Sequence, residues 1–260
     1  MKEKKKHTDE NQPSLLAISN PFASLSVSQH SRGKKDIPKE LFTILKKYQK
    51  KDATSRSKAF DELLSFAKTQ SDPQEIAPLL DVLWSDFKIW TSDPERKVRE
   101  EAINLLAFLI ASHKKAIQTN FRQLAYPLLA TLFDPVPSVS GTCKQNIFDR
   151  YFSEKGKLSA LLQSAKPEIL SQLKESVSLE KTFEETFYEP SEGRMMLERR
   201  IGCAFMVFSL VRREFQIDTL DLLGGLEGIL HILQHERKEN PQGSSYLKKS
   251  IYEIQYQSRH

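Results

Sequence analysis

The sequence has 260 residues with 39% hydrophobic content, only 9 glycines and 2 cysteines, which allows one or two packed domains and argues against loop-rich β folds and glycine-rich phosphate loops. The two cysteines exclude a disulfide framework, indicate a reducing compartment, and are too few for a structural zinc site without several histidine or carboxylate partners. The net charge of +5 is concentrated at the start, because residues 1–51 carry 12 Lys or Arg against 5 Asp or Glu, leaving 27 against 29 for the rest.

Residues 1–36 are rich in Ser, Lys and Asn and show no periodicity, so we expect a flexible basic tail. The apolar patch at residues 15–18 is too short for a secretory signal. The longest apolar-rich run, Ile201 to Val211, is far shorter than the ~20 residues that span a bilayer. We therefore expect a cytosolic protein without membrane contact, with the nucleus as an alternative because of the lysines near the start.

From Ile37 onward, apolar residues recur every three or four positions, and no segment alternates as a half-buried strand does. Helices are predicted from residue 37 to about 48 and around residues 59–67. A third is predicted from Asp72-Pro73 to Trp90, with Asp72 as N-cap and the proline at the first helical position. The pattern predicts an all-α fold, with residues 37–260 forming HEAT-like helical hairpins of an α-solenoid.

A repeat supports this prediction. Asp93-Pro94 and Asp134-Pro135 lie 41 residues apart, and each is expected to begin a helix by capping its free N–H groups. Counting back another 41 residues reaches Asp52, which also begins a predicted helix. A period near forty built from two helices is typical of HEAT or armadillo repeats. Arg99 lies where HEAT repeats place an arginine that pairs with the aspartate of an adjacent repeat.

Regularity is lower in the second half. Lys166-Pro167 begins another predicted helix, residues 189–193 form a polar break, and residues 194–215 form a long hydrophobic helix. A further helix is expected from Asp218 to about His235, and the segment after Pro241 resembles the start of another repeat. Because a solenoid needs a polar capping unit, we expect this chain to be the amino-terminal piece of a longer protein.

Catalytic motifs are absent from the sequence: it has no HExxH, GxSxG, P-loop or CxxC pattern, so we expect no catalytic residue, cofactor, metal or small-molecule substrate. His231 and His235 share a predicted helix face but have no third ligand at matching spacing. Both cysteines fall within predicted helices and are expected in the core. Trp84, Phe87 and Trp90 form an apolar stripe that favours core packing over an aromatic ligand cage.

A cluster of cations is the one feature typical of a binding site. Six Lys or Arg residues occur within residues 46–58, enough to neutralise several phosphates. The alternative is that these lysines complement the negative end of a helix and keep a terminal repeat soluble. The predicted site consists of Lys46, Lys47, Lys50, Lys51, Asp52, Thr54, Arg56 and Lys58.

The segment KKYQKKDATSRSKAFDELLSF, residues 46–66, resembles a signature of the listerin family. Arg56 stands where that family has a lysine, and Ser55 and Phe60 depart mildly from the pattern. The resemblance continues through the segment DPERKVRE at residues 93–100 and the block LFDPVPSV at residues 132–139, and covers roughly residues 20–215. The positions that match in the first segment are Lys50, Lys51, Asp52, Thr54, Lys58, Ala59, Glu62 and Leu63.

Listerins are large RING-type E3 ubiquitin ligases of ribosome-associated quality control, with a HEAT-repeat solenoid and a RING domain at the far carboxyl end. The resemblance implies a non-catalytic recognition module in the cytoplasm. It would dock on 60S subunits, through ribosomal RNA and protein, beside a quality-control partner of the nuclear export mediator factor type. Two alternatives stay open. One is a generic HEAT adaptor or scaffold that uses its concave face, and the other is a small standalone enzyme.

Overall fold

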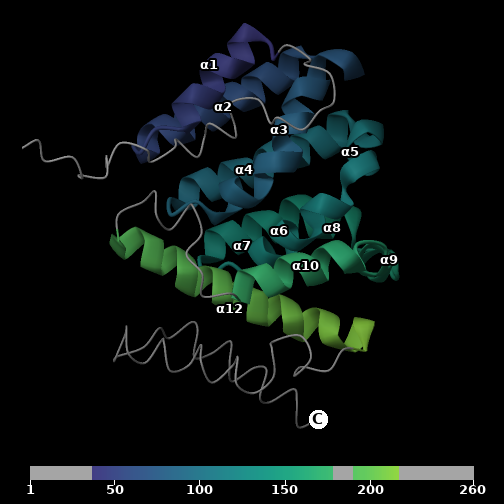
Figure 1. Ribbon diagram of the computed structural model, residues 1–260. Coiled ribbons are helices and arrows are strands. Elements are labelled where there is room, and N and C mark those ends of the chain that lie inside the picture. Colours follow the sequence, from purple (N-terminus) through teal and green to yellow (C-terminus); the bar gives the residue numbers. More distant parts are fainter. Residues whose placement is uncertain (1–36, 178–189, 217–260) are drawn as a thin grey trace, which may run out of the picture. The chain divides into compact units, whose positions relative to one another are not determined.

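A computed structural model describes residues 37–177 and 190–216 (Figure 1). Every regular element within these ranges is helical, which confirms the all-α prediction. The elements are α1 (Lys39–Tyr48), α2 (Ala53–Thr69), α3 (Pro73–Ser92), α4 (Arg96–Ser112), α5 (Lys114–Asn120), α6 (Arg122–Leu132), α7 (Pro137–Cys143), η2 (Lys144–Phe148), α8 (Asp149–Tyr151), α9 (Lys157–Ser164), α10 (Lys166–Val177) and α12 (Pro190–Phe215). The predicted tail, the helix after Asp218 and the segment after Pro241 lie outside the described residues.

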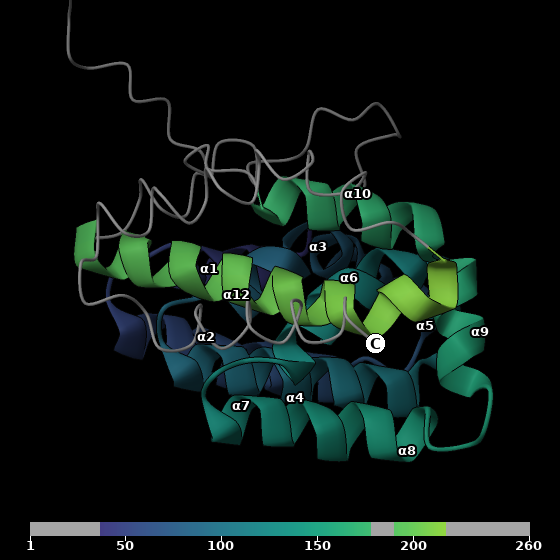
Figure 2. The same cartoon turned by 90° about the horizontal axis from the view of Figure 1, so that it is seen from below.

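Helical hairpins stack in chain order. α1 packs on α2, α3 on α4, and α6 on α7, where η2 continues the helix as a π-helical turn. Neighbouring hairpins meet through α2, α4 and α7 on one side and through α3, α6 and α10 on the other. Figure 2 separates α4 and α7 from α3 and α10 in this way. The long helix α12 packs against α6, α9 and α10.

The core follows the apolar faces that the periodicity predicts. Trp90 of α3 is fully buried and meets Phe60 of α2 edge to face, with ring centroids 5.2 Å apart. Tyr48 of α1 completes the group, its centroid 5.6 Å from that of Phe60 and 6.1 Å from that of Trp90. Edge-to-face pairs add roughly 0.5–1.5 kcal/mol each to the burial of the rings. These rings join the first three helices. Of the predicted aromatic stripe, Phe87 and Trp90 are buried in the core and Trp84 packs partly buried against it, which favours core packing as predicted.

The helix starts confirm part of the capping prediction and correct the rest. The Asp72 side chain accepts from the N–H of Gln74 at 2.7 Å, so it is the N-cap of α3, with Pro73 at the first helical position. Asp93 and Asp134 were predicted as N-caps, but α4 and α7 begin three residues after them, at Arg96 and Pro137. Each aspartate instead accepts one backbone N–H in the preceding turn and binds an arginine, as described below.

The long hydrophobic helix is present, but it begins earlier than predicted. α12 starts at Pro190, so the residues of the predicted polar break from 190 to 193 form its first turn. A proline is compatible with this position because the first turn needs no N–H donor there. Among the described helices, none is long and apolar enough to cross a membrane.

Candidate binding surface at the first helical hairpin

The turn between α1 and α2 carries the exposed cations of the predicted site. Lys46 lies in the last turn of α1, Lys50 and Lys51 lie in the connection, and Lys58 lies on α2, all with exposed side chains. We call these four lysines the basic α1–α2 surface. Thr54, in the first turn of α2, is also exposed. Asp52 is exposed in the connection as well, so the structure brings six of the eight predicted residues to one end of the first hairpin.

An aromatic ring that the sequence analysis missed adjoins this surface. Phe42 of α1 is 42% exposed, and the Lys46 ammonium lies 4.5 Å from its ring centroid. An ammonium over an aromatic face at an exposed site contributes about 0.5–1 kcal/mol. The sequence signal for this contact was the four-residue spacing of Phe42 and Lys46, because residues four apart on a helix are neighbours. Phe42 falls among polar positions of α1, where an apolar residue has no place in the core pattern.

The charge of Lys47 is offset by a carboxylate of α2. Its ammonium lies 2.6 and 2.7 Å from the two carboxylate oxygens of Glu62, which projects from α2. Both side chains are about two-fifths exposed, at 41% and 40%. The pair links α1 to α2 at the surface, where such bridges contribute at most about 1 kcal/mol. Lys47 therefore adds little positive potential for a partner.

Asp52 has a structural role at the same turn. Its carboxylate accepts from the backbone N–H of Ser55 at 2.8 Å and so caps α2. Hydrogen bonds from Ser55 lower the pKa of Asp52 below its ordinary value, with smaller contributions from Thr54 and Arg56. The carboxylate stays charged at neutral pH, and its negative charge lies among the lysines of the connection.

Arg56 is not on the surface. Its side chain is 3% exposed, and its Nε and Nη2 atoms donate to the two carboxylate oxygens of Asp93 at 2.8 and 3.0 Å. Its Nη1 atom donates to the carbonyl oxygens of Lys50, at 3.3 Å, and Lys51. A direct contact between the Arg56 guanidinium and a partner does not fit this burial. Arg56 is instead a positioning residue that holds the backbone carrying two lysines of the basic α1–α2 surface.

The same geometry recurs one repeat later. Arg99 Nε and Nη2 donate to the Asp134 carboxylate at 2.9 and 3.2 Å, which confirms the predicted pairing of Arg99 with the aspartate of the next repeat. Arg99 Nη1 donates to the carbonyls of Asp93 and Pro94 at 2.7 and 3.0 Å, as Arg56 does to Lys50 and Lys51. We call Arg56, Asp93, Arg99 and Asp134 the arginine–aspartate ladder.

The ladder corrects the repeat register. Because Arg56 and Arg99 make equivalent bonds, Lys50-Lys51 occupies the place of Asp93-Pro94, an offset of 43 residues. Asp52, reached by counting back 41 residues, is the N-cap of α2 and has no counterpart role in the ladder. The basic pair thus replaces the Asp-Pro pair at the first rung of the ladder among the described residues.

Nucleophilic and metal-binding groups are not assembled among the described residues. Cys143 is fully buried, its thiol donates to the Leu128 carbonyl at 3.6 Å, and burial raises its pKa. Cys203 is 5% exposed and donates to the Phe133 carbonyl at 3.5 Å. Within 37–177 and 190–216, no three His, Cys, Asp or Glu side chains could share a metal ion. The two histidines of the predicted helix after Asp218 lie outside these ranges.

Comparison with known proteins shows which family the chain belongs to. Residues 34–252 match the family model described as "E3 ubiquitin-protein ligase listerin, N-terminal domain". The chain belongs to this family. It is 32% identical over 118 residues to a listerin of Neurospora crassa, covering 45% of the chain and 7% of that protein. It is 30% identical over 128 residues to a listerin of Drosophila melanogaster, covering 49% of the chain and 7% of that protein.

The matching family model is that of the amino-terminal domain, and the aligned segment spans about one-fourteenth of either relative. No solved structure matches the chain. The helical hairpins and the basic α1–α2 surface described above both lie within the matched residues 34–252.

Proposed function

We propose that this chain is the recognition module of a listerin-type E3 ubiquitin ligase, and that it docks on 60S ribosomal subunits carrying stalled nascent chains. Ubiquitin transfer would be the task of a RING domain elsewhere in such a ligase. Membership of the listerin amino-terminal family is the observation that carries the proposal. The expected location is the cytosol, where such subunits occur.

The basic α1–α2 surface is the proposed contact with ribosomal RNA. Its four lysines have exposed side chains, and Arg56 fixes the backbone of two of them from within the fold. Lysines near RNA phosphates release counterions, and each contact to single-stranded or irregular RNA contributes about 0.7 to the salt slope. The exposed Phe42 ring beside Lys46 adds an apolar contact at the same place.

A second proposed contact is a quality-control protein of the nuclear export mediator factor type, bound to the same 60S subunit. Addition of this partner to 60S subunits should raise the amount of the chain that sediments with them. No increase at saturating partner would contradict this second contact while leaving the first intact.

Co-sedimentation of the 260-residue chain with purified 60S and 40S subunits tests the main proposal. We expect preferential binding to 60S subunits and its loss in the variant with Lys46, Lys50, Lys51 and Lys58 all changed to Glu. A matched control carries the same charge change at exposed lysines elsewhere, namely Lys114, Lys115, Lys144 and Lys155.

The outcomes separate the alternatives. Binding lost only in the first variant supports docking through the basic α1–α2 surface. Equal loss in both variants, or equal binding to 40S and 60S subunits, reduces the interaction to nonspecific attraction between charges. If neither variant nor wild type binds 60S subunits, the generic HEAT adaptor is the better account.

A further inference from the structure

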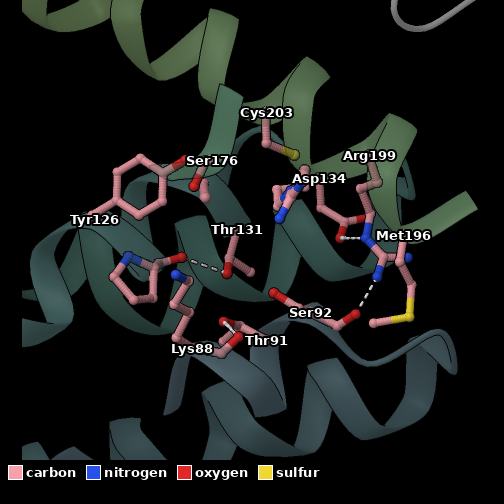
Figure 3. Close-up of a pocket in the computed structure, with 13 residues that line it drawn as sticks. Lys88, Thr91, Ser92, Tyr126, Thr131, Asp134, Ser176, Met196, Arg199 and Cys203 are labelled. Atoms are coloured by element: carbon pink, nitrogen blue, oxygen red, sulfur yellow. Dashed lines mark hydrogen bonds and ion pairs between the residues drawn. The ribbon is translucent and has the colours of Figure 1, made fainter. Parts of the chain in front are cut away.

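A pocket of about 50 Å³ lies between α3, α6, α10 and α12 (Figure 3). The Nε atom of Arg199, which lines it, lies 4.0 Å from a carboxylate oxygen of Asp134. The Nη2 atom of the same arginine donates to the carbonyl oxygens of Ser92 and Asp93. These donors are engaged within the fold, in contrast to the exposed side chains of α1.

Two large apolar side chains are exposed among the described residues, Phe42 at 42% and Met195 at 55%. Phe42 projects from α1, the first helix of the described stack (Figure 1), whereas Met195 belongs to α12. Single exposed apolar residues are common on protein surfaces, so their surroundings decide whether they have a function. Only the ring of Phe42 adjoins the basic α1–α2 surface, through its contact with Lys46.

Lysines lie on both sides of the Phe42 ring along α1. Lys39 is three residues before Phe42 and Lys46 is four residues after it, so both share its side of the helix. Both lysines are exposed, and Lys50 continues the row in the connection to α2. Glu40, the acidic residue of the first turn, is two positions from Phe42 and so does not share that side. The ring is thus set between cations along about 10 Å of helix.

A ligand for this row has to offer a flat apolar surface and negative charge close together. An apolar protein surface would cover the ring, but it would also remove water from the flanking lysines, which is costly for charged groups. An acidic protein segment would pair with the lysines and leave the ring without a contact. A nucleotide offers both features, because its base stacks on an aromatic ring while its phosphate lies beside a cation.

We infer that the basic α1–α2 surface binds unpaired RNA, with one base stacked on Phe42 and the adjoining phosphates beside Lys46 and Lys50. The inference rests on the proposed docking to ribosomal RNA and adds the form of that RNA, a single-stranded loop or end. Bases in a duplex are stacked on their neighbours and cannot take this place. The Lys46 ammonium is compatible with stacking because a ring has two faces. Phe42 is then a specificity-determining residue, whereas the lysines attract any phosphate backbone.

Fluorescence anisotropy of the 260-residue chain with labelled RNA tests the inference. The probes are a single-stranded oligouridine dodecamer and an RNA duplex of the same length, measured at one salt concentration. Phe42→Ala should weaken binding of the single strand about tenfold, the effect of losing one stacked base. The same variant should bind the duplex as the wild type does, because the lysines are unchanged.

Two further variants separate stacking from apolar bulk. Phe42→Leu keeps an apolar side chain but has no π face, so it should weaken single-strand binding as Phe42→Ala does. Phe42→Trp should keep the wild-type affinity or exceed it, because indole also stacks on a base. Met195→Ala removes the other exposed apolar side chain and is the matched control, with unchanged binding expected. Far-ultraviolet circular dichroism checks that each variant keeps its helices.

Equal affinity of wild type and Phe42→Ala for the single strand would overturn the inference. So would an equal loss for the duplex, because the ring would then not distinguish unpaired bases. If Phe42→Ala weakened 60S binding without affecting oligouridine, the ring would contact a ribosomal protein, and the inference would also fail.

The inference and the proposed docking can fail separately. If the variant with the four lysines changed to Glu loses 60S binding while Phe42→Ala binds 60S subunits and oligouridine as wild type does, the docking stands and the stacking is refuted. If Phe42→Ala weakens oligouridine binding but the wild type does not bind 60S subunits, the stacking stands and the docking is refuted.

Discussion

The pair of Arg56 and Asp93 gives the sharpest test of the fold. Arg56→Met removes two hydrogen bonds, of 2.8 and 3.0 Å, to a carboxylate that is fully buried. It also removes the donors to the carbonyls of Lys50 and Lys51. Breaking one side of a buried ion pair costs about 3–5 kcal/mol. For a domain of this size, that loss lowers the melting temperature by roughly 6–20 °C.

A double-mutant cycle distinguishes the pair from the sum of two separate effects. Asp93→Asn keeps an oxygen that can accept from the Glu95 N–H, which now donates to the carboxylate at 2.8 Å. Burial raises the pKa of Asp93 despite the opposing hydrogen bonds from Arg56, and each single variant leaves one buried polar group without its partner. The double variant should therefore lose less stability than the two single variants together, by about 2–3 kcal/mol.

Urea unfolding followed by far-ultraviolet circular dichroism measures these free energies, with exposed Arg150→Met as the control. A loss below about 0.5 kcal/mol for Arg56→Met, or strict additivity in the cycle, would refute the structural role of Arg56. Binding of folded Arg56→Met to 60S subunits adds a second criterion. Because Arg56 holds the backbone of Lys50 and Lys51, weaker binding of the folded variant would agree with this positioning role, and unchanged binding would contradict it.

Three further predictions concern the core. Asp86 is 3% exposed, and burial raises its pKa from 3.8 to about 6, so the folded state loses stability as pH rises through this window. In urea titrations at pH 7.5, Asp86→Asn should therefore be more stable than wild type by about 2–3 kcal/mol. This gain should fade near pH 4, and a gain that persists there would contradict the raised pKa. Cys143 should react with a thiol reagent only on unfolding, because burial raises its pKa; rapid labelling of the native chain at this residue would show otherwise. Trp90→Ala should cost about 3–5 kcal/mol by loss of the ring cluster with Phe60 and Tyr48, and a change under 1 kcal/mol would contradict that packing.

Helices were predictable from the sequence because their signals are local. Apolar spacing of three and four residues and the Asp72-Pro73 start depend on neighbours within a few positions, and the described helices follow them. Arg99 was assigned correctly because it occurs within the repeated Asp-Pro segment. Arg56 has the same environment, but Lys50-Lys51 replaces the Asp-Pro pair before it. The sequence therefore did not show that Arg56 occupies the same position in the repeat as Arg99.

Contacts between distant segments were not predictable. The pairing of Lys47 with Glu62 depends on how α1 and α2 align, which neither helix shows by itself. Arg199 meets the carbonyls of Ser92 and Asp93 more than 100 residues away in the chain. A charged residue on an apolar helix face has no periodic signature that separates a buried ion pair from a surface contact. The cluster of cations was thus identified as a whole, whereas the burial of Arg56 required the fold.

The salt dependence of 60S binding tests the central claim most directly. If four lysines of the basic α1–α2 surface contact RNA phosphates, log affinity against log salt should have a slope of about −3 for wild type. Change of Lys46, Lys50, Lys51 and Lys58 to Glu should abolish binding across the salt series, while the Lys114, Lys115, Lys144 and Lys155 control should keep the wild-type slope. Identical slopes and affinities for wild type and the first variant would contradict the account.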